Sequence, residues 1–342
     1  MKLARVLLWL ACALVVLALL AGGGYGLLFY RPPPPPAPVL PIPNGYDDLV
    51  RGGSMVTAPE KDLEKMGAED LRAYLSRNQN ALEAVRLGLL RESRVPLTYT
   101  EEFAANTAQL TLLVTPMRHL FEAEGMLAEK EERPSEAIRS YLDWFRVGVK
   151  GIRGGLLVHR IVGGACQSGA LRRLQRLEAG LGAVEYRLAI HGLERAASEE
   201  EPVEEFLKRE EAWWRTLSSW SELALSRVLN GDVLGQFEHS FRISIARQRL
   251  LLADLAIRAH RLEKGAPPRT LADLVPQFLS SIPEDPFARR PLLYRADGSN
   301  YRLYSVGPDG RDDGGLLVPE KDLEVKGDYF LETDLLPAPL DP

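Results

Sequence analysis

A short acidic segment near the carboxyl terminus carries the residues best suited to bind an ion. Asp309, Asp312 and Asp313 place three carboxylates within five residues, and glycines follow them directly. Clustered oxygen donors suit a hard cation such as calcium, which takes six to eight oxygen ligands from carboxylates and backbone carbonyls. The alternative is an ordinary Asp/Gly-rich surface turn. The residues alone leave both interpretations open.

The same segment, DGRDDGGLLVPE, matches an EF-hand loop only in part. Positions 1, 5, 6 and 12 of that loop are filled by Asp309, Asp313, Gly314 and Glu320. Position 3 is Arg311, whose positive charge repels a metal ion, and we expect a strand and a loop on either side rather than two helices. A calcium site here would therefore not be an EF-hand.

Other side chains that could do chemistry are scattered through helical sequence. Glu122 and Glu124 lie near His119 on one expected helix and could serve acid–base chemistry, which would suit an envelope hydrolase. A solvated helix face is the simpler interpretation. Cys166 is the lone thiol beyond the first thirty residues, and we expect it to be buried among small residues. We assign no catalytic residue.

The acidic segment belongs to a stretch that differs in character from the rest of the chain. A helix is expected to end at Gly265, a short helix to span Thr270–Val275, and two strands to follow at Leu292–Arg295 and Tyr301–Ser305. Asp297-Gly298 lies between the strands, which is typical of a β-hairpin. We therefore expect a small antiparallel module here.

This stretch, about residues 254–330, resembles the C-terminal half of type II secretion major pseudopilins. The matching pieces, in order, are Leu271-Ala272-Asp273-Leu274-Val275, Pro283-Glu284-Asp285-Pro286-Phe287, Pro291-Leu292-Leu293-Tyr294 and Tyr304-Ser305-Val306-Gly307-Pro308-Asp309-Gly310. The resemblance implies a long helix packed on a small antiparallel sheet, with a calcium-binding loop after the Ser-x-Gly-x-Asp-Gly turn. It implies a calcium role for Asp309 and for Asp328.

An apolar segment at the amino terminus predicts a membrane anchor. No charged residue occurs from Val6 to Tyr30, and a bilayer core requires about 20 helical residues. A signal peptide cleaved near Ala21–Gly24 is the alternative. Lys2 and Arg5 precede the segment while Arg31 alone follows it closely, so the positive-inside rule places the body on the extracytoplasmic side. We expect a single-pass protein of the inner membrane with a periplasmic body.

The sequence that links this anchor to the body is rich in proline. Residues 32–43 read PPPPPAPVLPIP, and each proline ring fixes φ and removes a hydrogen-bond donor. Such a sequence favours an extended polyproline II segment. We expect a stiff stalk over residues 31–56.

Helical periodicity dominates residues 57–264. Pro134 and Ser135 begin one clear pattern, with Ile138, Tyr141 and Phe145 on one face. No strand alternation occurs before about residue 290. The fold class expected is mainly α, α+β overall, with an irregular antiparallel helical bundle or short solenoid. The expected divisions are 1–30 anchor, 31–56 stalk, 57–237 helical domain, and 238–342 long helix plus β module.

The charge balance bears on the partner. Residues 31–342 contain 40 basic and 47 acidic side chains, and no basic stripe runs through them. Nucleic-acid binders need basic groups to displace phosphate counterions, so we expect no nucleic acid and instead a protein partner. The leading hypothesis is a non-enzymatic, membrane-anchored envelope interaction protein. The alternatives are an accessory component of a type II secretion-like system and the envelope hydrolase.

Overall fold

The computed structural model describes residues 30–100, 103, 108–219, 233–315 and 327–331. The expected anchor, residues 1–30, lies outside this part of the chain except for Tyr30. Among the described helices, none combines the length and the apolar character needed to cross a bilayer.

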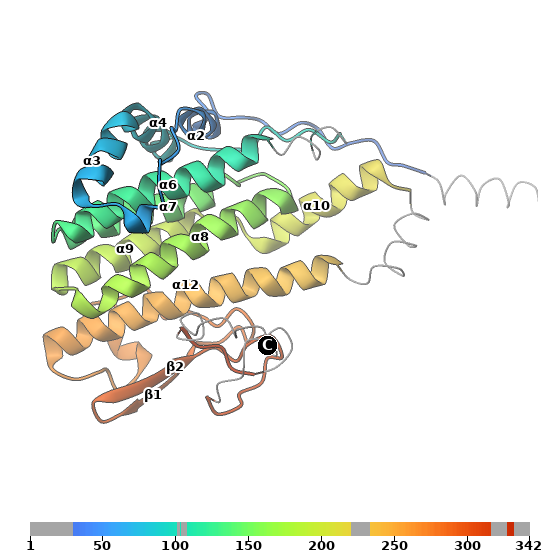
Figure 1. Ribbon diagram of the computed structural model, residues 1–342. Helices are drawn as coiled ribbons and strands as arrows, with labels where there is room; N and C mark the ends of the chain where they lie inside the picture. Colours follow the sequence, from blue (N-terminus) through green and yellow to red (C-terminus); the bar gives the residue numbers. More distant parts are fainter. Residues whose placement is uncertain (1–29, 101–102, 104–107, 220–232, 316–326, 332–342) are drawn as a thin grey trace, which may run out of the picture.

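Long helices packed side by side form the body of the protein (Figure 1). They are α6 (Ala108–Lys130), α7 (Pro134–Lys150), α8 (Leu157–Leu177), α9 (Ala183–Glu199) and α12 (Val233–Lys264). The central helix is α7, which packs on α6, α8 and α9, while α12 packs on α9. The prediction of a mainly helical protein with a small antiparallel sheet is confirmed.

Helix α7 illustrates why these helices form where they do. Pro134 occupies the first turn, where a missing N–H costs nothing and a fixed φ favours the helix. Ile138, Tyr141 and Phe145 then fall on one face and are fully buried. Further along α7, Gly148 meets Gly163 of α8 so closely that a Cβ on either residue would lie within 2.6 Å of the other's carbonyl oxygen.

Three shorter helices cover one side of the bundle. They are α2 (Gly45–Ser54), α3 (Ala68–Arg77) and α4 (Gln79–Leu90), preceded in the case of α3 by the 3-10 turn η1 (Leu63–Lys65). Tyr46 and Leu49 of α2 belong to the main core. Residues 45–54 therefore form part of the folded body, although the stalk was expected to extend to residue 56.

The proline-rich segment lies against the body. Pro32, Pro35, Pro38 and Pro41 are half-buried while most residues between them are exposed. This spacing of three matches the three residues per turn of polyproline II. Pro32, Pro33 and Pro35 face α10 (Val203–Leu217) across a cavity of about 350 Å³. The segment thus runs beside α10 before it enters α2 (Figure 1).

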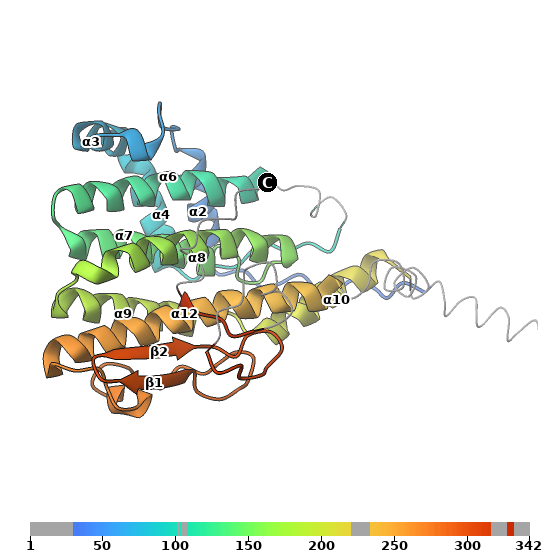
Figure 2. The ribbon, with the colours of Figure 1, turned by 60° about the horizontal axis from the view of Figure 1, so that its bottom comes forward.

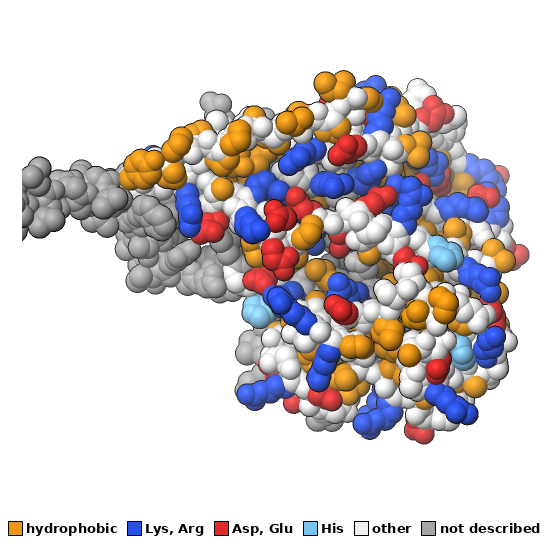
Figure 3. All heavy atoms as spheres, turned by 180° about the vertical axis from the view of Figure 1, so that it is seen from behind, with side chains coloured by type: hydrophobic (Ala, Val, Ile, Leu, Met, Phe, Trp, Pro, Cys, Tyr) orange, Lys and Arg blue, Asp and Glu red, His pale blue; other side chains and the backbone are white. Residues whose placement is uncertain are grey.

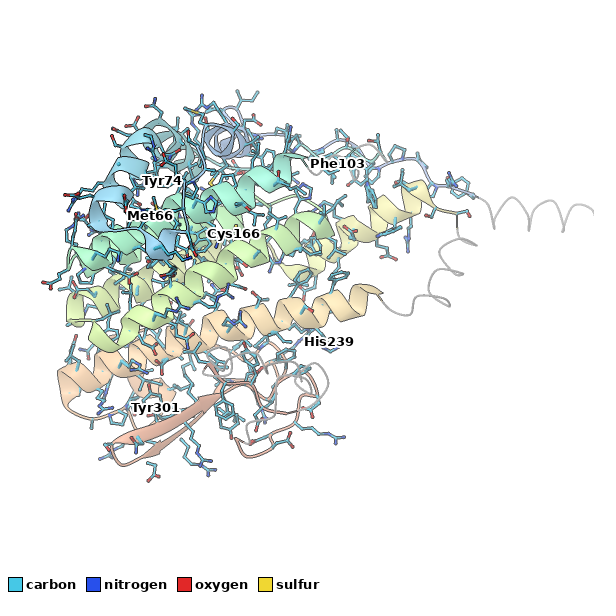
Figure 4. All side chains as sticks on the ribbon, viewed as in Figure 1. Met66, Tyr74, Phe103, Cys166, His239 and Tyr301 are labelled. Carbon is cyan, nitrogen blue, oxygen red and sulfur yellow. The ribbon has the colours of Figure 1, made fainter. Side chains whose placement is uncertain are left out.

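The C-terminal module packs beneath α12 (Figure 2). It contains η3 (Leu271–Leu274) and the antiparallel strands β1 (Leu293–Asp297) and β2 (Asn300–Tyr304), with Asp297 paired to Asn300 across the turn. Strand β2 lies one residue before its predicted position, while β1 begins one residue later and ends two residues later than predicted. The Tyr301 hydroxyl donates a hydrogen bond to Asp254 of α12, joining the sheet to the helix (Figure 4).

One hydrophobic core runs through both the helices and this module. It contains residues from α2 to Leu331, including Leu250 and Leu255 of α12 and Leu303 of β2. Helix α12 begins at Val233 and contributes to packing on both sides. The boundary expected at residues 237–238 therefore falls inside one helix, and the two parts share a core.

Cys166 is buried within the helical layers, as predicted (Figure 4). Its Sγ donates to the Leu113 carbonyl oxygen at 3.1 Å. Burial raises the pKa of the thiol to about 12, so the reactive thiolate is disfavoured.

Candidate functional site

The segment that carries the predicted calcium ligands is held by a backbone bridge. Ser305, which follows β2, exchanges two backbone hydrogen bonds with Tyr329, at 2.9 Å and 2.8 Å. Gly307 has φ of +69°, and a Cβ there would lie 2.0 Å from the Gly327 carbonyl oxygen. Only glycine fits this approach. The bridge brings Asp328 next to the acidic segment, although the two are separated by undescribed residues 316–326.

Asp328 has no accessible surface. Its carboxylate accepts backbone N–H bonds from Asp313 at 3.4 Å and from Gly315 at 2.8 Å. Burial raises the pKa of Asp328, and the charges of Asp312 and Asp313 raise it further, against the lowering effect of the two N–H donors. No cationic side chain of the described residues forms an ion pair with this carboxylate.

The other three predicted ligands are placed differently. Asp312 accepts from the Tyr304 hydroxyl at 3.1 Å and from its own loop at Gly314 N, whereas Asp309 accepts from Arg311 N in a separate turn. Within the described residues, no three acidic, His or Cys side chains converge closely enough to hold a metal ion. The structure thus brings Asp312 and Asp313 near Asp328 and leaves Asp309 apart.

A second candidate site is a groove of about 610 Å³ between the helices and the C-terminal module. Its walls come from Arg160 of α8, the end of α9 with residues 200–204, one face of α12, and the loop 284–289. We call it the interlobe groove. On the face seen from behind, acidic and basic side chains are interspersed (Figure 3).

Part of the charge in the interlobe groove is internally paired. Arg242 pairs with Glu238 at 2.5 Å and donates to the Pro286 carbonyl oxygen at 3.0 Å. Glu201 accepts two bonds from Arg209, which lies outside the groove. These groups stabilise the walls of the groove, because their hydrogen bonds are made to other parts of the protein.

Two buried donors in the interlobe groove lack such partners. Arg160 is 8% exposed, and its guanidinium lies 5.4 Å from the centre of the Phe241 ring. It makes no hydrogen bond or ion pair with another described residue. Gln248 is 5% exposed and its Nε2 has no hydrogen-bond acceptor. A buried polar atom is rarely left in this condition, so Gln248 Nε2 calls for an explanation. The Arg160 nitrogens are not among the buried atoms without a partner, so they keep accessible surface in the groove.

Glu200 lies beside these donors. Its Oε1 accepts from Gln167 Nε2 at 2.8 Å. Burial raises the pKa of Glu200, while the nearby charges of Arg160 and Arg249 oppose that rise. Arg160 and Arg249, from different helices, therefore approach the same carboxylate.

The residues considered for a hydrolase do not form a site together. Glu122 pairs with Arg173 at 2.5 Å, and Glu124 pairs with Arg86 at 2.6 Å and accepts from Ser140. The two carboxylates thus engage different arginines on different neighbouring helices. Burial lowers the pKa of His119, which contacts Arg118 instead of either glutamate.

Sequence reasoning missed the interlobe groove. Its free donors, Arg160 and Gln248, lie 88 positions apart on helices where each looks like an ordinary surface residue. The one local signal was Pro283-Glu284-Asp285-Pro286-Phe287, whose three central residues line the groove but which was assigned only to the resemblance.

No family model, curated protein or solved structure matches this chain. The class that the described residues define is a helical protein with a small C-terminal antiparallel module. Its function rests on the geometry of the acidic loop and the interlobe groove.

Proposed function

We propose that this chain is a membrane-anchored extracytoplasmic interaction protein whose C-terminal module is ordered by calcium. The apolar segment Val6–Tyr30 would hold it in the inner membrane, with the body in the periplasm. The body would act by binding a protein partner. The proline-rich segment would lead from the bilayer to the end of the body where α10 lies.

The observation that carries the calcium proposal is the buried carboxylate of Asp328. A carboxylate removed from water is costly unless it is paired with a cation or well hydrogen-bonded. Here two backbone donors serve it, and two further carboxylates lie close enough to raise its pKa. A divalent cation would offset that repulsion and use the same oxygens as ligands.

Asp312 and Asp313 are the neighbours that could join Asp328 around such an ion. Their segment contains Gly310, Gly314 and Gly315, all at positive φ, so its carbonyl oxygens can turn towards a common centre. Asp309 would have to leave its turn with Arg311 in order to contribute.

The test is thermal unfolding of the full-length chain in detergent micelles, in millimolar calcium and in excess chelator. A ligand that binds only the folded state stabilises it by RT ln(1 + [L]/Kd), or about 2.7 kcal/mol at 100-fold excess over Kd. We expect a higher melting temperature in calcium and no such gain in magnesium. Coinciding curves would reject the ion site and leave the loop as a turn.

A role as an accessory component of a type II secretion-like system is a second candidate. Support for it comes from the 32-residue helix α12 packed beside the small β1–β2 sheet, the arrangement that the pseudopilin resemblance implies. Cross-linking in cells that express a secretion pseudopilus would test it. Recovery of pseudopilin subunits with the chain is the supporting result, and their absence at saturating cross-linker would exclude the role.

A further inference from the structure

The interlobe groove contains preformed hydrogen-bond donors that the calcium proposal does not use. We propose that it binds a peptide segment that presents a carboxylate to Arg160 and Gln248 and a cationic group to the exposed acids Glu204 and Glu284 of the groove. The inference deepens the proposed interaction role and rests on it, but it is independent of calcium.

Arg160 is the main reason for expecting a carboxylate. Its guanidinium is fixed over the Phe241 ring, and its five N–H groups have no acceptor among the described residues. These nitrogens are not among the buried atoms that lack a partner, so they keep accessible surface in the groove and are available to a ligand. A carboxylate matches the planar fork in size and geometry and would accept two bonds at once.

Gln248 supplies a second donor from α12. Its Nε2 is buried and has no acceptor, and the residue lines the same groove as Arg160. Arg249 is its neighbour in sequence, and its Nη1 donates a hydrogen bond to the Glu284 carbonyl oxygen at 2.7 Å. Its other N–H groups remain available to a ligand. Two helices thus place amide and guanidinium donors at the same groove.

The acids of the lining argue against a strongly anionic ligand such as phosphate. Four arginines and six acidic residues line the groove, so the lining is net acidic. Glu204 and Glu284 are exposed and make no hydrogen bond or ion pair through their side chains with described residues. A ligand that carries both a carboxylate and an ammonium or guanidinium group can bind the arginines and these free acids at once, whereas a dianion would be repelled.

The size and rigidity of the groove suit a few residues of extended peptide. Its volume of about 610 Å³ falls within the range of ordinary ligand sites. Val203, Ile245 and Leu252 add apolar wall for side chains. Asp285, which is buried, holds the loop 284–289 through Ser305 Oγ at 2.9 Å and Val306 N at 2.8 Å. A preformed wall reduces the ordering cost of binding.

The experiment is calorimetric titration of the full chain in detergent micelles with defined probes. The first probe is N-acetyl-Lys-Ala-Ala with a free carboxyl terminus, and the second is the same peptide amidated. A third, N-acetyl-Lys-Ala-Asp-Ala-amide, carries its carboxylate on a side chain. We expect at least one carboxylate probe to bind with a Kd below about 1 mM, and the amide to bind at least tenfold more weakly. The first and third probes distinguish a chain terminus from an internal acidic residue.

Two variants test the residues. Arg160→Gln removes the charge from the proposed carboxylate position and should weaken binding at least tenfold, and Gln248→Leu should weaken it severalfold. Arg187→Gln is the matched control, because Arg187 is an exposed helical arginine paired with Glu263 outside the groove. Melting temperatures of all three variants show whether they remain folded. Should Arg160→Gln unfold, Arg160→Lys serves in its place, since it keeps the charge and loses the bidentate fork.

Several results would overturn the proposal. These are equal binding of the acid and amide probes, unchanged affinity in Arg160→Gln, binding of inorganic phosphate that displaces the peptides, and no heat from any probe at 5 mM. A chain that binds no probe but still melts higher in calcium would reject the groove assignment alone. The reverse pattern would reject the calcium site and keep the groove.

Discussion

Asp328 and Arg173 show two ways in which a charge is accommodated inside this protein. Asp328 relies on backbone donors alone among the described residues. Arg173, by contrast, is buried with Glu122 at 2.5 Å and Glu64 at 2.6 Å, partners that come from distant points in the sequence. The Asp328 carboxylate could therefore still bind a cation, whereas the Arg173 charge is already neutralised by its two glutamates.

Asp328→Asn should abolish the calcium-dependent rise in melting temperature, which we expect to be about 5 °C in the unmodified chain. The amide is nearly isosteric but neutral, and it offers a single ligand oxygen. Thermal melts in calcium and in chelator measure the difference. Arg311→Ala, which removes a cation from the same loop, serves as the control and should keep the full rise. Retention of the rise in Asp328→Asn would exclude this carboxylate as a ligand.

The raised pKa of Asp328 predicts a pH dependence of stability. Its pKa in the folded protein lies above the ordinary value of 3.8, so the folded state binds this proton more tightly than the unfolded chain does. Without calcium, this group should therefore favour folding at low pH and oppose it as pH rises through the raised pKa. The difference in melting temperature between the unmodified chain and Asp328→Asn, followed in chelator from pH 7 to pH 4, isolates the effect. A difference that does not change with pH would contradict it.

Arg173→Met should destabilise the fold by about 3 kcal/mol, because it leaves the largely buried Glu122 without its closest cation. Denaturant unfolding measures the change. Arg187→Gln breaks an exposed pair and should cost less than about 1 kcal/mol. Equal losses in the two variants would mean that the Arg173 cluster adds nothing beyond a surface pair.

At the scale of helices, close packing depends on glycines at crossing points. Gly45 of α2 and Gly88 of α4 face each other, and a Cβ on Gly88 would lie 2.8 Å from the Gly45 carbonyl oxygen. That oxygen belongs to the backbone, so the two helices would have to separate. The contact also positions Leu49 in the core.

Gly88→Ala should therefore cost about 2 kcal/mol despite the higher helix propensity of alanine. Gly164→Ala is the matched control, because Gly164 is also inside a helix but nothing lies within 4 Å of the added Cβ. That change should be neutral or stabilising by up to about 1 kcal/mol. Unfolding curves compare them, and a neutral Gly88→Ala would show that α2 and α4 can separate freely.

At the scale of the whole molecule, the proposed orientation rests on the charges beside the apolar segment. A reporter fused after Pro342 should be active when it requires the periplasm and inactive when it requires the cytoplasm. The chain should also resist extraction from membranes by alkaline carbonate. The opposite reporter pattern would reverse the orientation, while a soluble body would indicate cleavage near Ala21–Gly24.

Local sequence signals determined many elements of this protein. Pro134 at the start of α7, the apolar periodicity behind it, and Asp297-Gly298 between two strands each act over a few residues, and the structure confirms all three. The acidic loop was visible for the same reason, since its carboxylates are adjacent in sequence. Helix α2 was missed because its three glycines give it weak helix propensity, and packing on α4 and α6 stabilises it.

Tertiary structure alone decided the environment of the functional groups. Asp328 is buried beside the acidic loop because the Ser305–Tyr329 bridge holds its segment against the chain after β2, and no local pattern encodes that contact. Arg160 and Gln248 became unpartnered donors of one groove only when α8, α9, α12 and the loop 284–289 came together. Burial and pairing depend on elements that are distant in sequence, whereas helix and turn formation depend on neighbours in the chain. For this physical reason the sequence predicted the elements but not the environment of the functional groups.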